Sequence, residues 1–404
     1  MQQLTFIKKL GATLIIAGTS IGAGMLALPM ITAANGFKIS LGLLVITWVL
    51  MAITAQLITE INLQFKSGTN FNSMAIKTLG IPGQIITWIS YVLLLYSLSA
   101  AYIAGGSEIL DKLLGTTTWQ SAIIIILVLG SFIYWGLHAV DHLNKLLITI
   151  KAILFFALAI VISPYISVPY LNIQTPNINY LWYSFPILIT SFGFHIVIPS
   201  IRRYFGDDPS NFQSLRVVVF IGSTIPLFIY ILWEIVTLGT IPLFGDNSFK
   251  MIAEHGDSIN GLINSLEQSL HIGYIARIAN AFTSVAITTS FLGVTMGLYH
   301  FNQDTYNLHP KKHFSRIIAF VITYLPPLIF VLFYPRGFVL ALGYASIFVA
   351  ILLIILPVLM VWKIRKDNNT HTLAKKTVLI LTLLAGVIII GLQIATSFNL
   401  LPYL

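Results

Sequence analysis

Helix-breaking and hydroxyl residues are concentrated in the first apolar segment of the chain. The stretch Gly18–Pro29 reads Gly-Thr-Ser-Ile-Gly-Ala-Gly-Met-Leu-Ala-Leu-Pro. Gly18 and Gly22 alone would fit close packing of two helices, as small residues four apart do. However, glycine weakens a helix and proline removes one of its hydrogen bonds. So many helix breakers in one stretch predict an interrupted helix, whose freed backbone groups could bind a polar ligand.

A second stretch of this kind occurs much later in the chain. Thr190–His195 reads Thr-Ser-Phe-Gly-Phe-His and lies between Pro186 and Pro199. The N-terminus of a half-helix has unpaired N–H groups and partial positive charge, which suit an α-carboxylate, whereas a C-terminus offers carbonyl groups to an ammonium or a cation. An amino acid carries both charges. Two interrupted helices therefore predict that protein backbone recognises the backbone of an amino acid.

The composition requires a lipid bilayer around the chain. Of its 404 residues, 57% are hydrophobic and only 9% are charged, which does not fit a soluble globular protein of this length. Cysteine is absent, which excludes disulfides and thiolate metal sites. The net charge of +9 would suit a nucleic acid only if the basic residues formed one soluble face.

Eleven stretches are long and apolar enough to cross a bilayer, which takes about 20 residues of helix. They lie near Leu10–Ala34, Ile39–Leu63, Gln84–Leu110, Trp119–Leu137, Lys145–Pro164, Leu181–Ile201, Arg216–Leu238, Ile272–His300, Ser315–Phe333, Gly337–Trp362 and Thr377–Asn399. If the N-terminus is cytoplasmic, 17 of the 22 Lys and Arg residues fall in inside segments. This positive-inside pattern predicts a cytoplasmic N-terminus and, after eleven crossings, a C-terminus outside. It also explains the net charge without a nucleic acid partner.

The longest outside loop, Thr240–His271, is long enough for one or two short helices. The two interrupted stretches lie in spans one and six, which therefore run through the membrane in opposite directions. Corresponding breaks in halves of opposite topology are typical of inverted-repeat transporters with a site at mid-membrane. We predict a single all-α transport domain over residues 1–404, with repeats at about 10–164 and 181–362 and an additional helix at about 377–399.

Together these motifs resemble those of the bacterial tryptophan/tyrosine permeases, the hydroxy/aromatic amino acid permease family of the amino acid–polyamine–organocation superfamily. The resemblance rests on Gly18–Pro29, Ser191–His195, Pro199 and the basic run Arg202–Tyr204, and it covers the whole chain. It implies the leucine-transporter (LeuT) fold of five plus five spans, with an eleventh span, in the bacterial inner membrane. It also implies import of an aromatic amino acid by proton symport through alternating access, with tyrosine the first candidate and tryptophan the second.

The same resemblance implies that the two breaks hold the substrate. Ser20 and Gly24 would border its carboxylate, and the carbonyls of Thr190 and Ser191 would face its ammonium. The other candidates for substrate binding come from the two motifs, with one tyrosine chosen for its mid-span position: Thr19, Gly22, Phe192, Phe194, His195 and Tyr96. Aromatic rings and lone histidines in membrane spans are also common as packing partners. His195 would therefore either bind a substrate hydroxyl or hold the break in shape.

A lysine and a set of residues on span eight are the candidates for ion coupling. Lys151 lies about two turns inside span five, where a lysine that reaches back to the interface would fit equally well. Sodium-coupled relatives of the fold hold a cation between span-one carbonyls and an Ala-x-x-Thr/Ser-Ser/Thr set on span eight. The residues that match this site are Gly18, Ile21, Ala286, Thr289 and Ser290. Proton-coupled relatives place a span-five lysine there, so the resemblance implies H⁺ as the coupling ion and Na⁺ as the alternative.

Other classes of protein fit the sequence less well. An enzyme would need a catalytic pair or metal ligands on one water-exposed face, and a channel would need polar periodicity along its pore. The histidines are instead scattered along the chain. We expect no catalysis, no cofactor and no resident metal. A membrane-embedded enzyme or receptor and a permease of another specificity are the alternatives, and the sequence leaves the oligomeric state open.

Overall fold

The part of the chain that the structure describes consists mainly of helices joined by short turns and loops. The computed structural model describes residues 6–135, 137–173, 179–256, 258–270, 272–309 and 312–401. Within these residues, ten helices are long and apolar enough to cross a membrane, and a bent pair at the start forms an eleventh span. The predicted all-α class and the eleven predicted spans are therefore confirmed.

The spans follow one another along the chain with few additions. Span one comprises α1 (Phe6–Ser20) and α2 (Gly24–Thr32). The next four are α3 (Phe37–Leu63), α4 (Phe71–Leu114), α5 (Thr118–Trp135) and α6 (Leu137–Ile162). After the short α7 (Val168–Leu171), span six consists of α8 (Tyr180–Ser191) and α9 (Ile198–Phe205). The remaining spans are α10 (Phe212–Leu238), α13 (Gly273–Thr305), α14 (His313–Phe333), α15 (Phe338–Val349) continued by α16 (Leu356–Asp367), and α17 (Leu373–Ser397).

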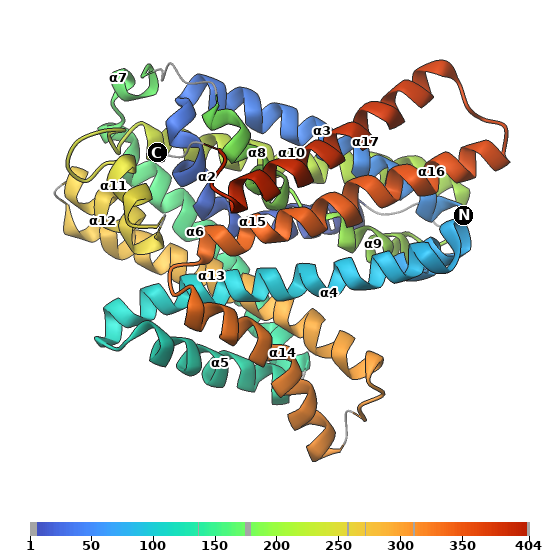
Figure 1. The fold of residues 1–404 in the computed structure, drawn as a ribbon, viewed down its shortest axis with the longest axis horizontal. Helices are drawn as coiled ribbons and strands as arrows, with labels where there is room; N and C mark the ends of the chain where they lie inside the picture. The colour runs from blue at the N-terminus through green and yellow to red at the C-terminus, as the bar shows by residue number, and fades with distance from the viewer. Residues whose placement is uncertain are drawn as a thin grey trace.

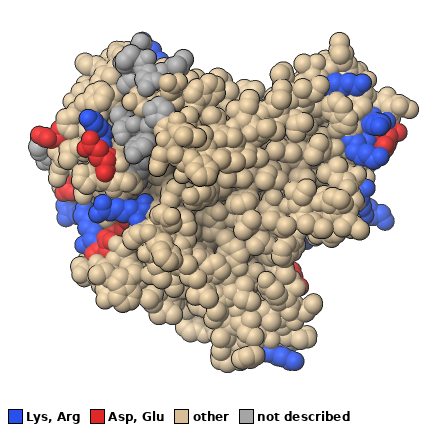
Figure 2. Space-filling view, in the orientation of Figure 1, with Lys and Arg blue, Asp and Glu red and all other residues tan. Residues whose placement is uncertain are grey.

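Charged residues lie mainly at the two ends of the molecule. The N-terminus lies near α9 and α16, and the C-terminus lies at the opposite end, near α11 (Phe249–Glu254; Figure 1). Figure 2 shows most of the Lys, Arg, Asp and Glu atoms on this face at these ends, with further basic atoms at the lower edge and a broad uncharged surface between. Such a surface suits the hydrocarbon core of a bilayer. Termini at opposite ends are what an odd number of crossings requires.

Both predicted helix breaks are confirmed. α1 ends at Ser20 and α2 begins at Gly24, and the two are bent by 52°. In place of the helical pattern, the Gly22 N–H donates to the Ser20 carbonyl at 2.7 Å. α8 ends at Ser191, and a 3-10 turn that begins at His195 leads into α9. Four helix ends are therefore placed inside the protein rather than at its surface.

The broken spans pack against each other and against their neighbours. α2 packs on α8, α10 packs on α1 and α3, and α4 packs along α13 and α15. The loop Thr240–His271 contains the two short helices that its length allows, α11 and α12 (Ile259–Leu270). A Cβ atom on Gly105 of α4 would lie 2.6 Å from Cδ1 of Ile259. The apolar face of α12 is thus packed tightly on α4 at the end that carries the C-terminus.

Polar contacts connect the spans at the end that carries the N-terminus. Arg365 of α16 donates to both carboxylate oxygens of Glu60 in α3, at 2.8 and 2.6 Å. Asp207 accepts bonds from the Ser67 N–H at 2.8 Å, the Ser67 hydroxyl at 2.9 Å and Arg202 at 2.9 Å. The bonds from Ser67, together with the charge of Arg202, hold the pKa of the Asp207 carboxyl below its ordinary value. The turn between α9 and α10 is therefore tied to the turn between α3 and α4.

Span ten contains a feature that the sequence analysis did not predict. A π-helical segment, Ala350–Ile355, lies between α15 and α16. Pro357 lies two residues after it and has no N–H to donate to the preceding turn. A π-helical turn absorbs such an irregularity without ending the helix.

Candidate functional site

One tyrosine connects the two helix breaks. Tyr230 of α10 donates from its hydroxyl to the Ser20 carbonyl at 2.7 Å and to the Ser191 carbonyl at 2.6 Å. Ser20 and Ser191 are the last residues of α1 and α8. The C-terminal ends of both half-helices, which carry partial negative charge, therefore converge on a single hydroxyl. The sequence analysis did not propose Tyr230 for the site.

The break in span one also contacts spans five and eight. Lys151 of α6 donates from Nζ to the Ile21 carbonyl at 2.5 Å, and its side chain is only 5% exposed. The Ala23 N–H donates to the Ser290 hydroxyl of α13 at 2.9 Å. Lys151, Ile21 and Ser290, which were all proposed for ion coupling, thus meet at one break. A charge-assisted bond from a buried ammonium to a freed carbonyl is a strong contact.

The other proposed coupling residues contribute less directly. The Thr289 hydroxyl donates within its own helix to the Ala286 carbonyl at 3.0 Å. Thr289 and Ala286 are both buried. Gly18 lies inside α1, and a Cβ atom added there would meet nothing within 4 Å. The structure therefore brings the lysine, rather than the threonine hydroxyl, to the break.

Backbone and hydroxyl groups surround the start of α2. α2 begins at Gly24, and its Met25 and Leu26 N–H groups donate back to the Gly22 and Ala23 carbonyls at 3.3 and 3.0 Å. The Gly24 N–H, by contrast, has no partner among the described residues. A Cβ atom on Gly24 would lie 3.3 Å from the Ser191 hydroxyl, and one on Gly22 would lie 2.8 Å from the Ser290 hydroxyl. The Ser20 hydroxyl is buried and has no hydrogen-bond partner among the described residues. Glycine at positions 22 and 24 thus lets the break and the start of α2 pack closely on α13 and α8, and the Ser20 hydroxyl has no partner in the described part of the chain that a ligand would have to displace.

The two phenylalanines of the span-six motif lie in different surroundings. The Phe192 ring is fully buried, edge-on to Tyr230 with 5.0 Å between ring centroids. The Phe194 ring lies against the His195 ring at 4.7 Å, in an apolar cluster with residues of α1, α3, α9 and α10. His195 Nε2 lies 2.9 Å from the Thr54 hydroxyl of α3. This contact fits the second interpretation of His195, in which it holds the break in shape.

Three further candidates form bonds away from the pair of carbonyls that Tyr230 joins. The Thr190 hydroxyl donates to the Pro186 carbonyl at 3.3 Å and to the Leu342 carbonyl at 3.4 Å. Thr19 is exposed and donates to a carbonyl of its own helix. The Tyr96 hydroxyl donates to the Ile322 carbonyl of α14 at 2.9 Å.

Tyr102 is the α4 tyrosine that lies closer to the breaks. It is only 7% exposed, and its hydroxyl lies near Ser290 and Tyr230. Tyr96 was proposed from its position along the span, which gives depth but not the direction in which a side chain points. A six-residue step turns a helix by about 240°. The small residues around Tyr102, in Ser-Ala-Ala-Tyr-Ile-Ala-Gly-Gly, were the signal of close packing there.

A buried carboxyl lies one helical turn beyond Tyr230. Glu234 is fully buried, and the Thr32 hydroxyl of α2 lies 2.9 Å from each of its carboxyl oxygens. Thr32 also lies 2.8 Å from the Leu28 carbonyl. Among the described residues, no Lys, Arg or His forms an ion pair with Glu234. A buried carboxyl without a counter-charge is a candidate for carrying a proton.

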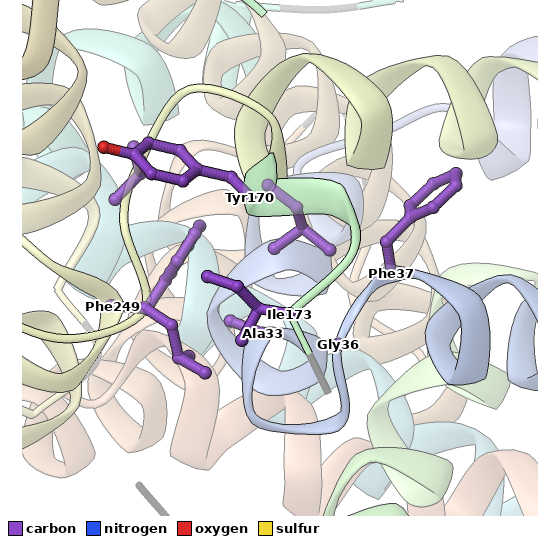
Figure 3. A pocket seen from close by; sticks show the side chains of 9 residues that line it. Ala33, Gly36, Phe37, Tyr170, Ile173 and Phe249 are labelled. Atoms are coloured by element: carbon purple, nitrogen blue, oxygen red, sulfur yellow. The ribbon is translucent and has the colours of Figure 1, made fainter. Parts of the chain in front are cut away.

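Two cavities lie apart from the breaks, toward the end that carries the C-terminus. One, of about 20 Å³, is lined by apolar side chains of the α2–α3 turn, α7 and the segment after α10, including Tyr170, Ile173 and Phe249 (Figure 3). It has room for about one water molecule. The other, of about 520 Å³, lies between α8, α15 and α17 and is lined by Ile187 and Gln393 among others. Within the described residues, no group of three or more His, Asp or Glu side chains could hold a metal ion.

The fold defines a class of protein: a helical membrane transporter with two broken helices, whose ends form the candidate site. Residues 7–394 match the Tryptophan/tyrosine permease family, and the chain belongs to this family. It is therefore a permease and not an enzyme.

Curated relatives and a solved structure agree with this assignment. The chain is 34% identical to the Tyrosine-specific transport system 2 of Haemophilus influenzae, over 98% of both chains. It is 32% identical to the Tryptophan-specific transport protein of Pseudomonas aeruginosa, over 97% of this chain and 96% of the relative. The manganese transporter of Eremococcus coleocola has a similar structure, with a TM-score of 0.67 at 15% identity, over 98% of this chain and 90% of that one. This likeness confirms the predicted LeuT-type fold.

Proposed function

We propose that the protein imports an aromatic amino acid, tyrosine first and tryptophan second, together with a proton and by alternating access. The observation that carries the proposal is the convergence of the two helix breaks, where the ends of α1 and α8 meet at Tyr230 and the start of α2 lies beside α8. Relatives that are specific for tyrosine and for tryptophan support the substrate class. The bacterial inner membrane, a cytoplasmic N-terminus and repeats at 10–164 and 181–362 belong to the same proposal.

The helix ends can bind both charges of an amino acid. The Gly24 N–H, at the start of α2, would donate to the α-carboxylate, with the unpartnered Ser20 hydroxyl as a further donor. The carbonyls of Ser20 and Ser191 would accept from the ammonium. Tyr102, beside Ser290, would complete the polar side of the site. The Phe192 ring would contact the aromatic side chain of the substrate.

The coupling ion would be carried at the break of span one. Lys151 donates to the Ile21 carbonyl at the place where a coupled sodium ion would otherwise be expected. An ammonium there supplies the positive charge, and a lysine amine can exchange its proton when its surroundings change. This contact favours H⁺ over Na⁺ as the coupling ion.

Uptake by proteoliposomes tests the function directly. Labelled tyrosine, tryptophan and phenylalanine would be supplied under an imposed pH gradient without sodium, and separately under a sodium gradient at constant pH. We expect saturable accumulation of tyrosine and tryptophan with the pH gradient alone. Accumulation that requires sodium would contradict proton coupling, and failure of all three substrates to accumulate would contradict the substrate class.

The two phenylalanines of span six should differ in their contribution to binding. Replacing Phe192 by alanine should weaken the binding of tyrosine and tryptophan by about 1–3 kcal/mol, because a ring contact is lost beside the carbonyl pair. Phe194→Ala removes an equally buried ring that packs away from Tyr230, and it should weaken binding less. Calorimetric titration of both purified variants, with thermal unfolding as a check of folding, measures the difference. Equal losses would mean that both rings act only by holding the break in shape.

A further inference from the structure

We propose that the Tyr230 hydroxyl occupies the place of the substrate ammonium while the transporter is empty, and that an arriving amino acid displaces it. This inference rests on the proposed function, because it assigns a competitor to the proposed ammonium site. Tyr230 would then be a positioning residue that joins the two breaks in the empty state. It would also make the transporter select for ligands that carry an amine.

The hydroxyl lies where both broken spans end. It donates to the last carbonyl of α1 at 2.7 Å and to the last carbonyl of α8 at 2.6 Å. Tyr230 is fully buried, and the Phe192 ring packs against it at 5.0 Å. No other side chain among the described residues is seen to bond either carbonyl; the Ser20 carbonyl accepts only the local Gly22 N–H in addition. The two carbonyls thus share one neutral hydrogen-bond donor.

A hydroxyl is a poor match for this pair of acceptors. It has one proton, so it can make one full hydrogen bond and must share that proton between two oxygens. Both oxygens lie at helix C-termini, where the aligned peptide dipoles favour a positive charge. An ammonium has three N–H donors and a full charge. A substrate ammonium should therefore replace the hydroxyl, although the exchange costs the bonds that Tyr230 makes in the empty protein.

The charged groups nearby are engaged elsewhere. Lys151 donates to the Ile21 carbonyl, one residue beyond Ser20. The Glu234 carboxyl, one turn along α10, contacts Thr32. Neither occupies the two carbonyls, so Tyr230 is the group that a ligand must displace. A ligand without an amine would have no donor strong enough to do so.

This competition predicts whether removing the Tyr230 hydroxyl strengthens or weakens the binding of amino acids. In Tyr230→Phe, both carbonyls lose their hydrogen-bond donor in the empty protein. In the loaded protein they still accept from the substrate ammonium. The empty state is then destabilised relative to the loaded state, and amino acids should bind more tightly. The net value of one hydrogen bond corresponds to a roughly two- to tenfold decrease in Kd. A purely structural role for the hydroxyl would weaken binding instead.

The test compares ligands with and without an amine on the purified full-length protein. Kd would be measured for L-tyrosine and for 3-(4-hydroxyphenyl)propionate with the parent, Tyr230→Phe and Tyr324→Phe. Tyr324 is a suitable control because its hydroxyl is also buried but lies in α14, and it donates to neither the Ser20 nor the Ser191 carbonyl. We expect a lower Kd for L-tyrosine in Tyr230→Phe only, and no comparable gain for the propionate. An unchanged or higher Kd for L-tyrosine in folded Tyr230→Phe would overturn the inference.

A second measurement does not require the Tyr230→Phe variant to fold. The parent with 3-fluorotyrosine at position 230 keeps the hydroxyl, and its fluorine resonance reports the surroundings of the ring. L-tryptophan should shift this resonance, whereas 3-(indol-3-yl)propionate should not. A parent protein that binds no aromatic amino acid would refute the proposed function, whereas one that binds L-tryptophan without moving the resonance would refute only the role of Tyr230.

Discussion

Replacing Lys151 by alanine should abolish the accumulation of tyrosine that a pH gradient drives. The ammonium donates to the Ile21 carbonyl at 2.5 Å inside the break of span one. A neutral amine would make a weaker bond to this carbonyl than the ammonium does. Loss of the proton from Lys151 should therefore change the conformation of the span-one break. A gradient of one pH unit can drive about tenfold accumulation for each coupled proton, and in the variant this ratio should fall to about one.

The measurement uses sodium-free proteoliposomes with labelled tyrosine. Lys363→Ala is the matched control, because that lysine is 53% exposed and pairs with Asp367 at the surface. Lys151→Ala should retain some exchange of internal for external substrate, since exchange moves no net proton. If Lys151→Ala accumulates tyrosine as well as the parent does, the lysine is only a structural contact. The coupling group must then be sought at the buried Glu234 or His195.

Replacing Gly24 by leucine should abolish substrate binding while the protein still inserts into the membrane. Even a Cβ atom at Gly24 would lie 3.3 Å from Oγ and 3.6 Å from Cα of Ser191. A larger side chain must separate α2 from α8 or fill the space that the carboxylate would need at the start of α2. Overpacking of this kind costs about 1–3 kcal/mol of folding free energy, and the blocked carboxylate position removes binding in addition.

Two further glycine variants distinguish loss of the binding site from a general loss of stability. Gly24→Ala should weaken binding less, because a single methyl group requires a smaller shift of Ser191. Gly42→Leu in α3 is the control, because a Cβ atom added there meets nothing within 4 Å. It should bind tyrosine as the parent does. Parental affinity in a folded Gly24→Leu variant, judged by its thermal unfolding, would show that the substrate does not bind at the start of α2.

The residues that the sequence singled out are only partly the ones that meet in the structure. Lys151 and Ser290 were identified from their spans, and both contact the break of span one. Phe192 and Phe194 were treated as equivalent, yet only Phe192 lies against Tyr230. The physical reason is the irregular backbone between them, because residues in a broken helix do not follow a fixed angular step. Their directions cannot be derived from spacing.

Tyr230 shows most clearly what sequence reasoning missed. It is one of 17 tyrosines, in a span without an unusual motif, and nothing in its neighbours along the chain marks it. Its importance comes from two carbonyls that lie 210 and 39 residues away. Backbone carbonyls have no identity in the sequence, so a side chain that recognises them leaves no pattern to find.

The sequence by itself determined the need for a membrane, the eleven spans and the positions of both breaks. These are local properties: a bilayer excludes unpaired backbone groups and turns each long apolar stretch into a helix, and glycine and proline interrupt helices where they occur. Only the tertiary structure decided which groups meet at the breaks. The period of a helix orders its side chains relative to one another, but the neighbour that each one faces depends on how the helices pack, and that packing placed Tyr230, Lys151 and Ser290 around the same freed backbone.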